Sequence, residues 1–133
     1  MNTAGGDGAR HISLVEDDPR IRRLIEAEIA DEGHRVSSFS SAEDFLEVAE
    51  DLQSDLVLLD LMLPGMDGLS CLRELQRIPT RPPRRVVVVT ALNDAAARQQ
   101  ALSLGAADYI LKPDLFERLP VLLESLERAE GEP

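Results

Sequence analysis

The chain has 133 residues and a formal net charge of −11, from 14 basic and 25 acidic side chains. This length and a hydrophobic fraction of 44% are typical of one globular domain. The charge excludes a basic face for binding nucleic acid, and no apolar run is long enough to cross a membrane. Residues 1–10 are rich in glycine and hold no hydrophobic secretion signal, so we expect them to form the flexible leader of a cytoplasmic protein.

The apolar run 12–15 predicts a short buried strand that ends at Glu16 and Asp17. Asp18 and Pro19 fit the N-cap and the first position of a helix, and apolar residues then repeat at helical spacing until a glycine. Two acids are therefore expected at the corner between the first strand and the first helix.

A second strand is predicted at residues 35–39. Ser40 and Glu43 then spell the S-x-x-E capping box of a second helix, in which the acid bonds back to the helix start. The apolar face of that helix is supplied by Ala42, Phe45, Leu46 and Ala49.

The central stretch, residues 55–68, reads D-L-V-L-L-D-L-M-L-P-G-M-D-G. Residues 56–59 are apolar without polar alternation, which predicts a strand buried on both faces and ending at Asp60. Turn formers and a third helical pattern follow, so Asp60 stands at a strand-to-helix corner, where parallel α/β sheets bind ligands. By itself, Asp60 fits a solvated strand end equally well. Cys71, the one cysteine, excludes an internal disulfide and fits a buried core position better than a reactive thiol.

The fourth unit begins with a predicted loop at residues 78–85, which contains three prolines. Residues 86–89 are four valines, a strongly β-favouring run that ends at Thr90. Asn93 or Asp94 can cap a fourth helix, which runs to the next glycine.

A fifth strand is predicted at residues 108–111 and ends at Lys112, the one lysine of the chain. Pro120 lies close to the beginning of the last helix, which predicts a late start or a kink. Residues 130–133 follow as an acidic tail. The apolar face of the last helix is supplied by Leu119, Leu122, Leu123 and Leu126.

The predicted order is five strands alternating with five helices over residues 11–129, joined by short connections. Parallel strands need helical crossovers, so this alternation predicts an α/β domain with a doubly wound parallel sheet covered on both faces. The sequence contains no internal repeat or linker that would divide this domain.

Four of the five predicted strands end in a residue that can handle a metal or a phosphoryl group: Glu16 with Asp17, Asp60, Thr90 and Lys112. The carboxyl ends of parallel strands lie at one edge of the sheet, so we expect these side chains to converge. Clustered carboxylates favour a hard cation such as Mg²⁺, while a lysine and a hydroxyl can bind phosphoryl oxygens. A carboxylate in such a site can act as a nucleophile. The alternative is an acidic surface edge with one compensating lysine.

Four motifs occur in order: L-V-E-D-D-P, L-L-D-L-M-L-P-G-M-D-G, V-V-V-V-T-A and D-Y-I-L-K-P. Together they resemble the receiver domain of two-component response regulators, the CheY-like group of flavodoxin-like folds, over residues 12–128. The resemblance implies a sheet in the order 2-1-3-4-5. It also implies phosphoryl transfer to Asp60 from the phosphohistidine of a sensor histidine kinase or phosphotransfer protein.

The resemblance further implies roles for the residues at the strand ends. Asp17 and Asp60 would bind Mg²⁺ directly, the Met62 backbone carbonyl would be a third ligand, and Glu16 would act through water. Thr90 and Lys112 would contact the phosphoryl group on Asp60.

Tyr109 matches the aromatic residue that turns inward in this family as the Thr90 hydroxyl moves toward the phosphate. From the sequence alone, a tyrosine in a strand is more often a core residue. The face formed by the fourth helix, the fifth strand and the last helix would bind an output partner, which the sequence does not identify.

The sequence departs from the family pattern at several positions. Met62 and Leu92, which flank the site, are bulky and apolar, and we interpret them as favouring slow self-dephosphorylation. Asp114 stands where the family often has phenylalanine. Ala107 and Leu122 replace an acid and a basic residue that are common in receivers joined to winged-helix DNA-binding domains, which disfavours that mode of dimerisation.

We therefore expect a phosphoacceptor switch, with at most weak self-phosphorylation and autophosphatase activity, that contacts neither nucleic acid nor membrane. An alternative is the receiver half of a longer DNA-binding transcriptional regulator. An Mg²⁺-dependent aspartyl phosphatase is disfavoured because Met62 stands where such enzymes have a second aspartate. A flavin-binding domain is disfavoured because acids, not a glycine-rich phosphate loop, follow the first strand.

Overall fold

The computed structural model describes residues 9–79 and 84–131, with side chains up to residue 126. Most of the expected leader, part of the proline-containing loop and the last two residues of the expected tail lie outside the described residues. None of the helices in the described part of the chain is both long and apolar enough to span a membrane.

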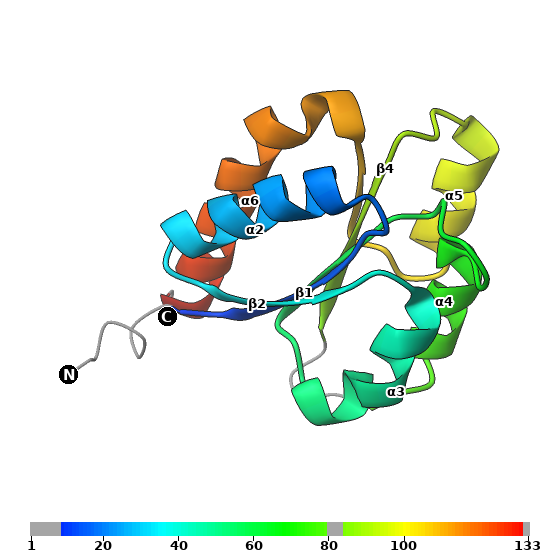
Figure 1. Cartoon of the computed structure of the whole chain (residues 1–133), viewed down its shortest axis with the longest axis horizontal. Coiled ribbons are helices and arrows are strands. Elements are labelled where there is room, and N and C mark those ends of the chain that lie inside the picture. Colours follow the sequence, from blue (N-terminus) through cyan, green and yellow to red (C-terminus); the bar gives the residue numbers. More distant parts are fainter. Residues whose placement is uncertain (1–8, 80–83, 132–133) are drawn as a thin grey trace.

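Five parallel strands form one sheet in the order β2-β1-β3-β4-β5, which confirms the predicted topology. Strands and helices alternate along the chain (Figure 1). The elements are β1 (His11–Val15), α2 (Pro19–Asp31), β2 (Arg35–Phe39), α3 (Ala42–Leu52), β3 (Leu56–Leu59), α4 (Gly68–Leu75), β4 (Arg85–Thr90), α5 (Ala95–Ser103), β5 (Asp108–Leu111), the 3₁₀ turn η1 (Lys112–Asp114) and α6 (Leu115–Gly131). Helix α6 thus extends two residues into the expected tail.

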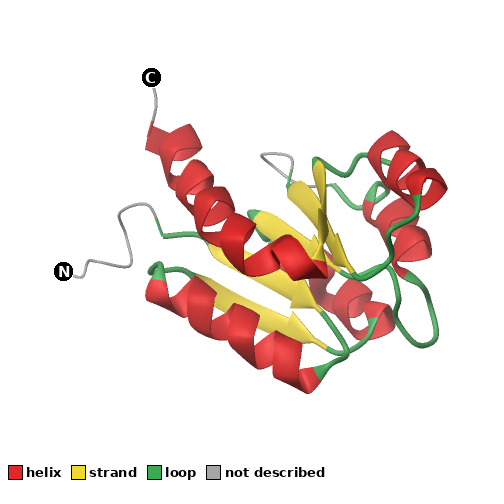
Figure 2. Ribbon diagram, turned by 90° about the horizontal axis from the view of Figure 1, so that it is seen from above, coloured by secondary structure: helices red, strands yellow, loops and turns green. Residues whose placement is uncertain are grey.

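The sheet lies between two layers of helices (Figure 2). Helices α2 and α6 pack on one face, where Ile25 and Leu119 join the inward side chains of β1, β3 and β4. Helices α3, α4 and α5 pack on the other face around Phe45 and Leu72. Every residue of β3 is 0% exposed, because this central strand contributes alternate side chains to both layers.

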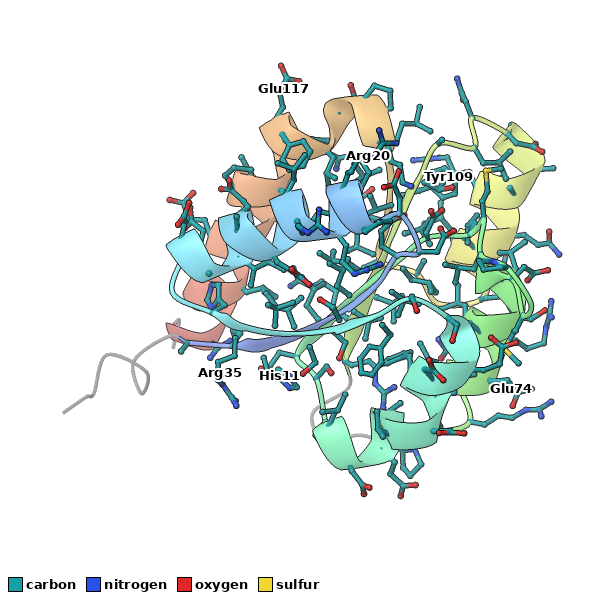
Figure 3. All side chains as sticks on the ribbon, viewed as in Figure 1. His11, Arg20, Arg35, Glu74, Tyr109 and Glu117 are labelled. Carbon is teal, nitrogen blue, oxygen red and sulfur yellow. The ribbon has the colours of Figure 1, made fainter. Side chains whose placement is uncertain are left out.

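Charged side chains lie mainly on the outer surfaces of the helices and at the strand ends. Glu117 and Arg35, for example, point away from the molecule (Figure 3). The apolar stripe of each helix faces the sheet, so the acidic composition of the chain is carried by its solvent-facing surface.

Two of the four helix starts with a side-chain cap are where the residue types predict them, at Asp18 and Asp94. Asp67, expected only as one of the turn formers after Asp60, is the N-cap of α4. The prediction of a capping box that starts at Ser40 is wrong. Ser41 is the N-cap of α3, and its hydroxyl accepts a hydrogen bond from the Asp44 N–H at 3.2 Å. The Glu43 carboxylate instead accepts a hydrogen bond from the Met66 N–H.

Helix α6 does not start late. It begins at Leu115, directly after η1, and Pro120 lies inside it. Leu115 and Leu119 are buried in the core, so packing holds the first turn in helical form. Pro120 has no N–H to donate to the carbonyl four residues earlier, that of Phe116, a residue that is 43% exposed.

Candidate functional site

The acids and the lysine of the predicted site lie together at the carboxyl edge of the sheet. Glu16 and Asp17 follow β1, and Asp60 follows β3. Carboxylate oxygens of these three residues lie within 4.8 Å of one another. Glu16 and Asp60 are buried, whereas Asp17 is exposed. The three acids therefore form one cluster, and two of its members are buried.

Main-chain bonds fix the two loops that carry the acids. The Asp60 N–H donates to the Val15 carbonyl at 3.1 Å and the Glu16 N–H donates to the Phe39 carbonyl at 3.0 Å, which extends the sheet pairing by one residue. The Arg22 guanidinium donates to the Glu16 carbonyl at 2.7 Å. The carboxylates are thus held together by backbone geometry, at a cost in charge repulsion that a cation relieves.

Lys112 forms ion pairs with the two buried acids. Its Nζ lies 2.9 Å from Glu16 Oε1 and 2.9 Å from Asp60 Oδ2. Burial alone would lower the pKa of Lys112, but the bonds to Asp60 and Glu16 raise it above its ordinary value. Burial, with repulsion from Asp60, raises the pKa of Glu16 in spite of its bonds to the Asp18 N–H and to Lys112.

The Asp60 carboxylate is oriented by two partners. Oδ2 contacts Lys112, and Oδ1 accepts a hydrogen bond from the Met62 N–H at 3.0 Å. The side chain is 3% exposed. Gly68, the first residue of α4, lies directly against the Asp60 main chain: a Cβ at this position would be 2.3 Å from the Asp60 carbonyl oxygen. Only a glycine lets the helix start so close to the acid.

Thr90 and Tyr109 meet at the main chain of Leu92. Thr90 Oγ1 accepts a hydrogen bond from the Leu92 N–H at 3.3 Å. The Tyr109 hydroxyl donates to the Leu92 carbonyl at 2.6 Å. Thr90 is 0% exposed and Tyr109 is 6% exposed, so the tyrosine ring is turned inward. Burial raises the pKa of Tyr109, with a smaller contribution from Asp94, so its hydroxyl stays protonated and able to donate.

Three contacts of the site were not predicted from the sequence. The first is the hydrogen bond from Arg22 to the Glu16 carbonyl, and the second is the one from the Met66 N–H to Glu43. The third is the pair of hydrogen bonds that Thr90 and Tyr109 make with the main chain of Leu92. Arg22 gives no signal because it is one of three arginines in the same helix. Main-chain partners have no sequence signal at all.

This geometry agrees with the comparisons to known proteins. The family model for the response regulator receiver domain matches residues 12–124. The chain belongs to the response regulator receiver family. Its fold is the CheY-like fold, in agreement with the sequence analysis.

Individual relatives are receivers or proteins that contain one. The transcriptional regulatory protein AfsQ1 of Streptomyces coelicolor is 39% identical over 75% of this chain and 43% of its own length. The BeF3-activated N-terminal receiver domain of Klebsiella pneumoniae RstA is 35% identical, with a TM-score of 0.73 over 85% of this chain and 97% of that one. A CheY-like receiver of Methanospirillum hungatei is 28% identical, with a TM-score of 0.78 over 91% and 98%. The chain spans about half the length of the curated relatives it matches.

The donor set of this receiver fits Mg²⁺, which receiver domains generally bind. Glu16, Asp17 and Asp60 offer hard carboxylate oxygens, and one of the three acids is open to solvent. A magnesium ion keeps several water ligands, so an exposed position at the site suits it.

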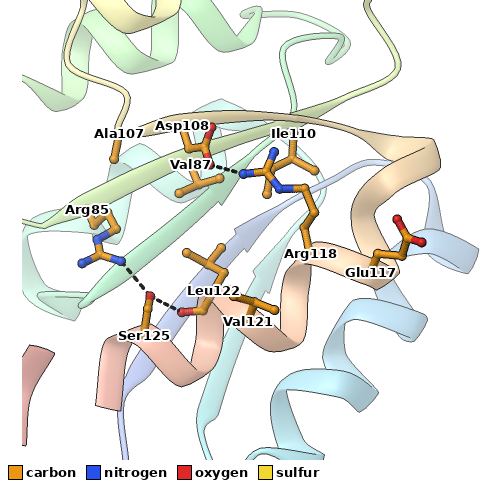
Figure 4. Close-up of a pocket in the computed structure, with 10 residues that line it drawn as sticks. All are labelled: Arg85, Val87, Ala107, Asp108, Ile110, Glu117, Arg118, Val121, Leu122 and Ser125. Atoms are coloured by element: carbon orange, nitrogen blue, oxygen red, sulfur yellow. Dashed lines mark hydrogen bonds and ion pairs between the residues drawn. The ribbon is translucent and has the colours of Figure 1, made fainter. Parts of the chain in front are cut away.

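A groove lies at the opposite end of β4 and β5 and holds none of the predicted site residues (Figure 4). Its volume is about 660 Å³, and Val87 and Ile110 line it beside α6. Arg118 pairs with Asp108 on one wall, and Arg85 donates to the Ser125 hydroxyl at 3.2 Å. Among the described residues, the cluster of three acids lies at the carboxyl edge and not in this groove.

Proposed function

We propose that this receiver accepts a phosphoryl group on Asp60 from the phosphohistidine of a sensor histidine kinase or phosphotransfer protein. The observation that carries the proposal is the position of the Asp60 carboxylate, which is buried, oriented by the Met62 N–H and in contact with the Lys112 ammonium. In the reaction an Asp60 oxygen attacks phosphorus, the phosphorus–nitrogen bond breaks, and its electron pair returns to the imidazole ring. The product is an acyl phosphate.

Asp17, Asp60 and the Met62 carbonyl would hold Mg²⁺, with Glu16 acting through water. When bound, this ion supplies positive charge to the phosphoryl oxygens. Lys112 then moves from its bond with the Asp60 carboxylate to a phosphoryl oxygen, while Glu16 keeps it at the site. The chain's own residues thus position the nucleophile and balance the charge that arrives with the phosphoryl group.

Thr90 and Tyr109 would pass the change to a partner surface. When the Thr90 hydroxyl moves to the phosphoryl group, it leaves the Leu92 N–H, which is its present partner. The Leu92 carbonyl holds the Tyr109 hydroxyl, so this movement changes the contact of the tyrosine. Tyr109 lies in β5, and the face of α5, β5 and α6 is where an output partner protein would bind.

The first test is intact mass after incubation with Mg²⁺ and acetyl phosphate. The wild-type protein is expected to gain one phosphoryl group, and Asp60→Asn is expected to gain none. Asp51→Asn is the matched control, because Asp51 is an exposed acid at the end of α3, away from the carboxyl edge. A wild-type protein that stays unmodified, or an Asp60→Asn protein that is modified equally, would contradict the proposal.

The phosphorylated state is expected to be long-lived. Met62 is 57% exposed and follows Asp60 by two residues, and Leu92 holds the corresponding place after Thr90. Both side chains are apolar and offer no group to orient an attacking water. Removal of the phosphodonor followed by mass measurements over time tests this, and decay within seconds would refute it.

A further inference from the structure

The carboxylate of Glu43, at the first turn of α3, bonds to a main-chain N–H outside its own helix. The sequence pattern assigns it to a capping box, but the cap is made by Ser41 and Asp44. Its Oε2 instead accepts a hydrogen bond from the Met66 N–H at 2.9 Å. Met66 lies 23 residues further along the chain, in the loop that joins Asp60 to α4.

The two ends of this loop, residues 61–67, are anchored by other contacts. Leu61 and Leu63 are buried in the core, and the Asp67 side chain caps α4 through the Ser70 N–H at 2.8 Å. Between the two anchors Pro64 and Gly65 are exposed, and the partly buried Met66 side chain packs against the core. The Glu43 bond adds a main-chain contact to this packing.

The fit of Glu43 against this segment is close. Gly65 has φ +73°, and a Cβ built on it would lie 2.6 Å from Glu43 Oε2. The carboxylate thus occupies the space that a side chain at position 65 would need. The Met66 N–H lowers the pKa of Glu43, so the carboxylate is ionised at neutral pH and the bond is assisted by its charge.

We propose that Glu43 is a positioning residue that holds the loop after Asp60 in the conformation that binds Mg²⁺. The inference rests on the proposed function, because the Met62 carbonyl, an expected ligand, belongs to the same loop. Without the Glu43 bond the segment around Met66 samples further conformations. The apparent dissociation constant for Mg²⁺ then rises in proportion to the fall in the competent fraction.

The test compares two acids on the same helix. Glu47 lies one turn after Glu43, is exposed, and has the same formal charge. Glu43→Ala and Glu47→Ala therefore remove equal charge, but only the first removes the bond to Met66. Glu43→Gln keeps a neutral acceptor of the same length and separates loss of the bond from loss of charge.

The dissociation constant for Mg²⁺ is measured by titration of amide resonances, with the Met66 amide as a separate readout in the metal-free protein. Since a charge-assisted surface bond is modest, Glu43→Ala is expected to raise the dissociation constant about three- to tenfold, and Glu43→Gln less. Glu47→Ala is expected to match the wild type. In Glu43→Ala the Met66 amide is also expected to shift and to exchange faster with solvent.

Equal effects of Glu43→Ala and Glu47→Ala, or an unchanged Met66 amide, would overturn the inference while leaving the proposed function intact. A wild-type protein that does not bind Mg²⁺ would overturn the proposed function itself, and the inference with it. Melting temperatures of the variants identify any global loss of structure, which exposed residues such as these are not expected to cause.

Discussion

Substitution of Gly68 by alanine is expected to damage both stability and phosphorylation. The new Cβ would lie 2.3 Å from the Asp60 carbonyl oxygen and 2.5 Å from the Leu61 Cα, both of which are main-chain atoms. Ordinary carbon contacts are about 3.5–4.0 Å, so α4 or the Asp60 main chain must move by roughly 1 Å. No flexible side chain is available to absorb the displacement, because both atoms belong to the backbone.

The cost of this movement follows from overpacking. A forced methyl group in a packed region costs about 1–3 kcal/mol, and alanine recovers up to about 1 kcal/mol through its better helix propensity. We therefore expect the free energy of unfolding to fall by about 1–2 kcal/mol in urea titrations. A displacement of about 1 Å at the nucleophile can slow a reaction about 100-fold, so phosphorylation by acetyl phosphate is expected to slow by at least tenfold.

Gly33→Ala is the control that separates the two effects. Gly33 has φ +86°, and a Cβ there would meet nothing within 4 Å. Alanine at this position is expected to lower the free energy of unfolding by about 1–2 kcal/mol through backbone strain alone. The phosphorylation rate is expected to stay unchanged. If Gly68→Ala were as stable as the wild type and accepted phosphate at the same rate, the close approach of α4 to Asp60 would not matter and the reasoning would be wrong.

Three further substitutions or treatments test other parts of the site. Lys112→Met removes the cation that contacts the Asp60 carboxylate, and we expect the phosphorylation rate, followed by intact mass, to fall about 100-fold or more; a rate near that of the wild type would refute this role. Tyr109→Phe deletes the donor to the Leu92 carbonyl, and urea unfolding is expected to show a loss of about 1 kcal/mol with no change in phosphorylation rate. Burial raises the pKa of the Cys71 thiol to about 12 from an ordinary 9.0, so the thiol stays protonated at pH 9 in the native state. Alkylation by iodoacetamide at that pH is expected only after unfolding in urea, and rapid modification of the native protein would contradict the assignment.

Most of the fold could be predicted from the sequence because the signals that carry it are local. The four-residue run before Asp60 is too short for a typical helix and has no polar alternation, which leaves a strand buried on both faces. The same reasoning at each strand end placed Glu16, Thr90 and Lys112 at one edge of the sheet. Because parallel strands end at the same edge of a sheet, their positions at strand ends are enough to predict that they lie close together.

The errors come from contacts between distant parts of the chain. Ser40 and Ser41 offer equivalent local patterns, each with an acid three residues later. Ser41 is the N-cap of α3. Glu43, the acid of the pattern that begins at Ser40, instead bonds to Met66 in a distant loop. Local patterns cannot distinguish two such registers.

The position of Pro120 has a similar cause. Local rules exclude proline from the middle of a regular helix, and they predict either a late start or a kink at Pro120, of which the late start is wrong. The burial of Leu115 and Leu119 against the sheet keeps the first turn helical, since tertiary packing contributes more than helix propensity.

The arrangement at Leu92 has a consequence for how sequences of this kind can change. Thr90 and Tyr109 both bond to main-chain atoms of Leu92, the first to its N–H and the second to its carbonyl. Any residue except proline offers the same N–H and carbonyl, so the link between site and surface does not depend on which side chain stands at this position. If Asp60 is phosphorylated as proposed, a substitution at residue 92 would change the lifetime of the acyl phosphate and leave both main-chain bonds to Thr90 and Tyr109 in place. The lifetime of the phosphorylated state and the contact with β5 would then change independently in evolution.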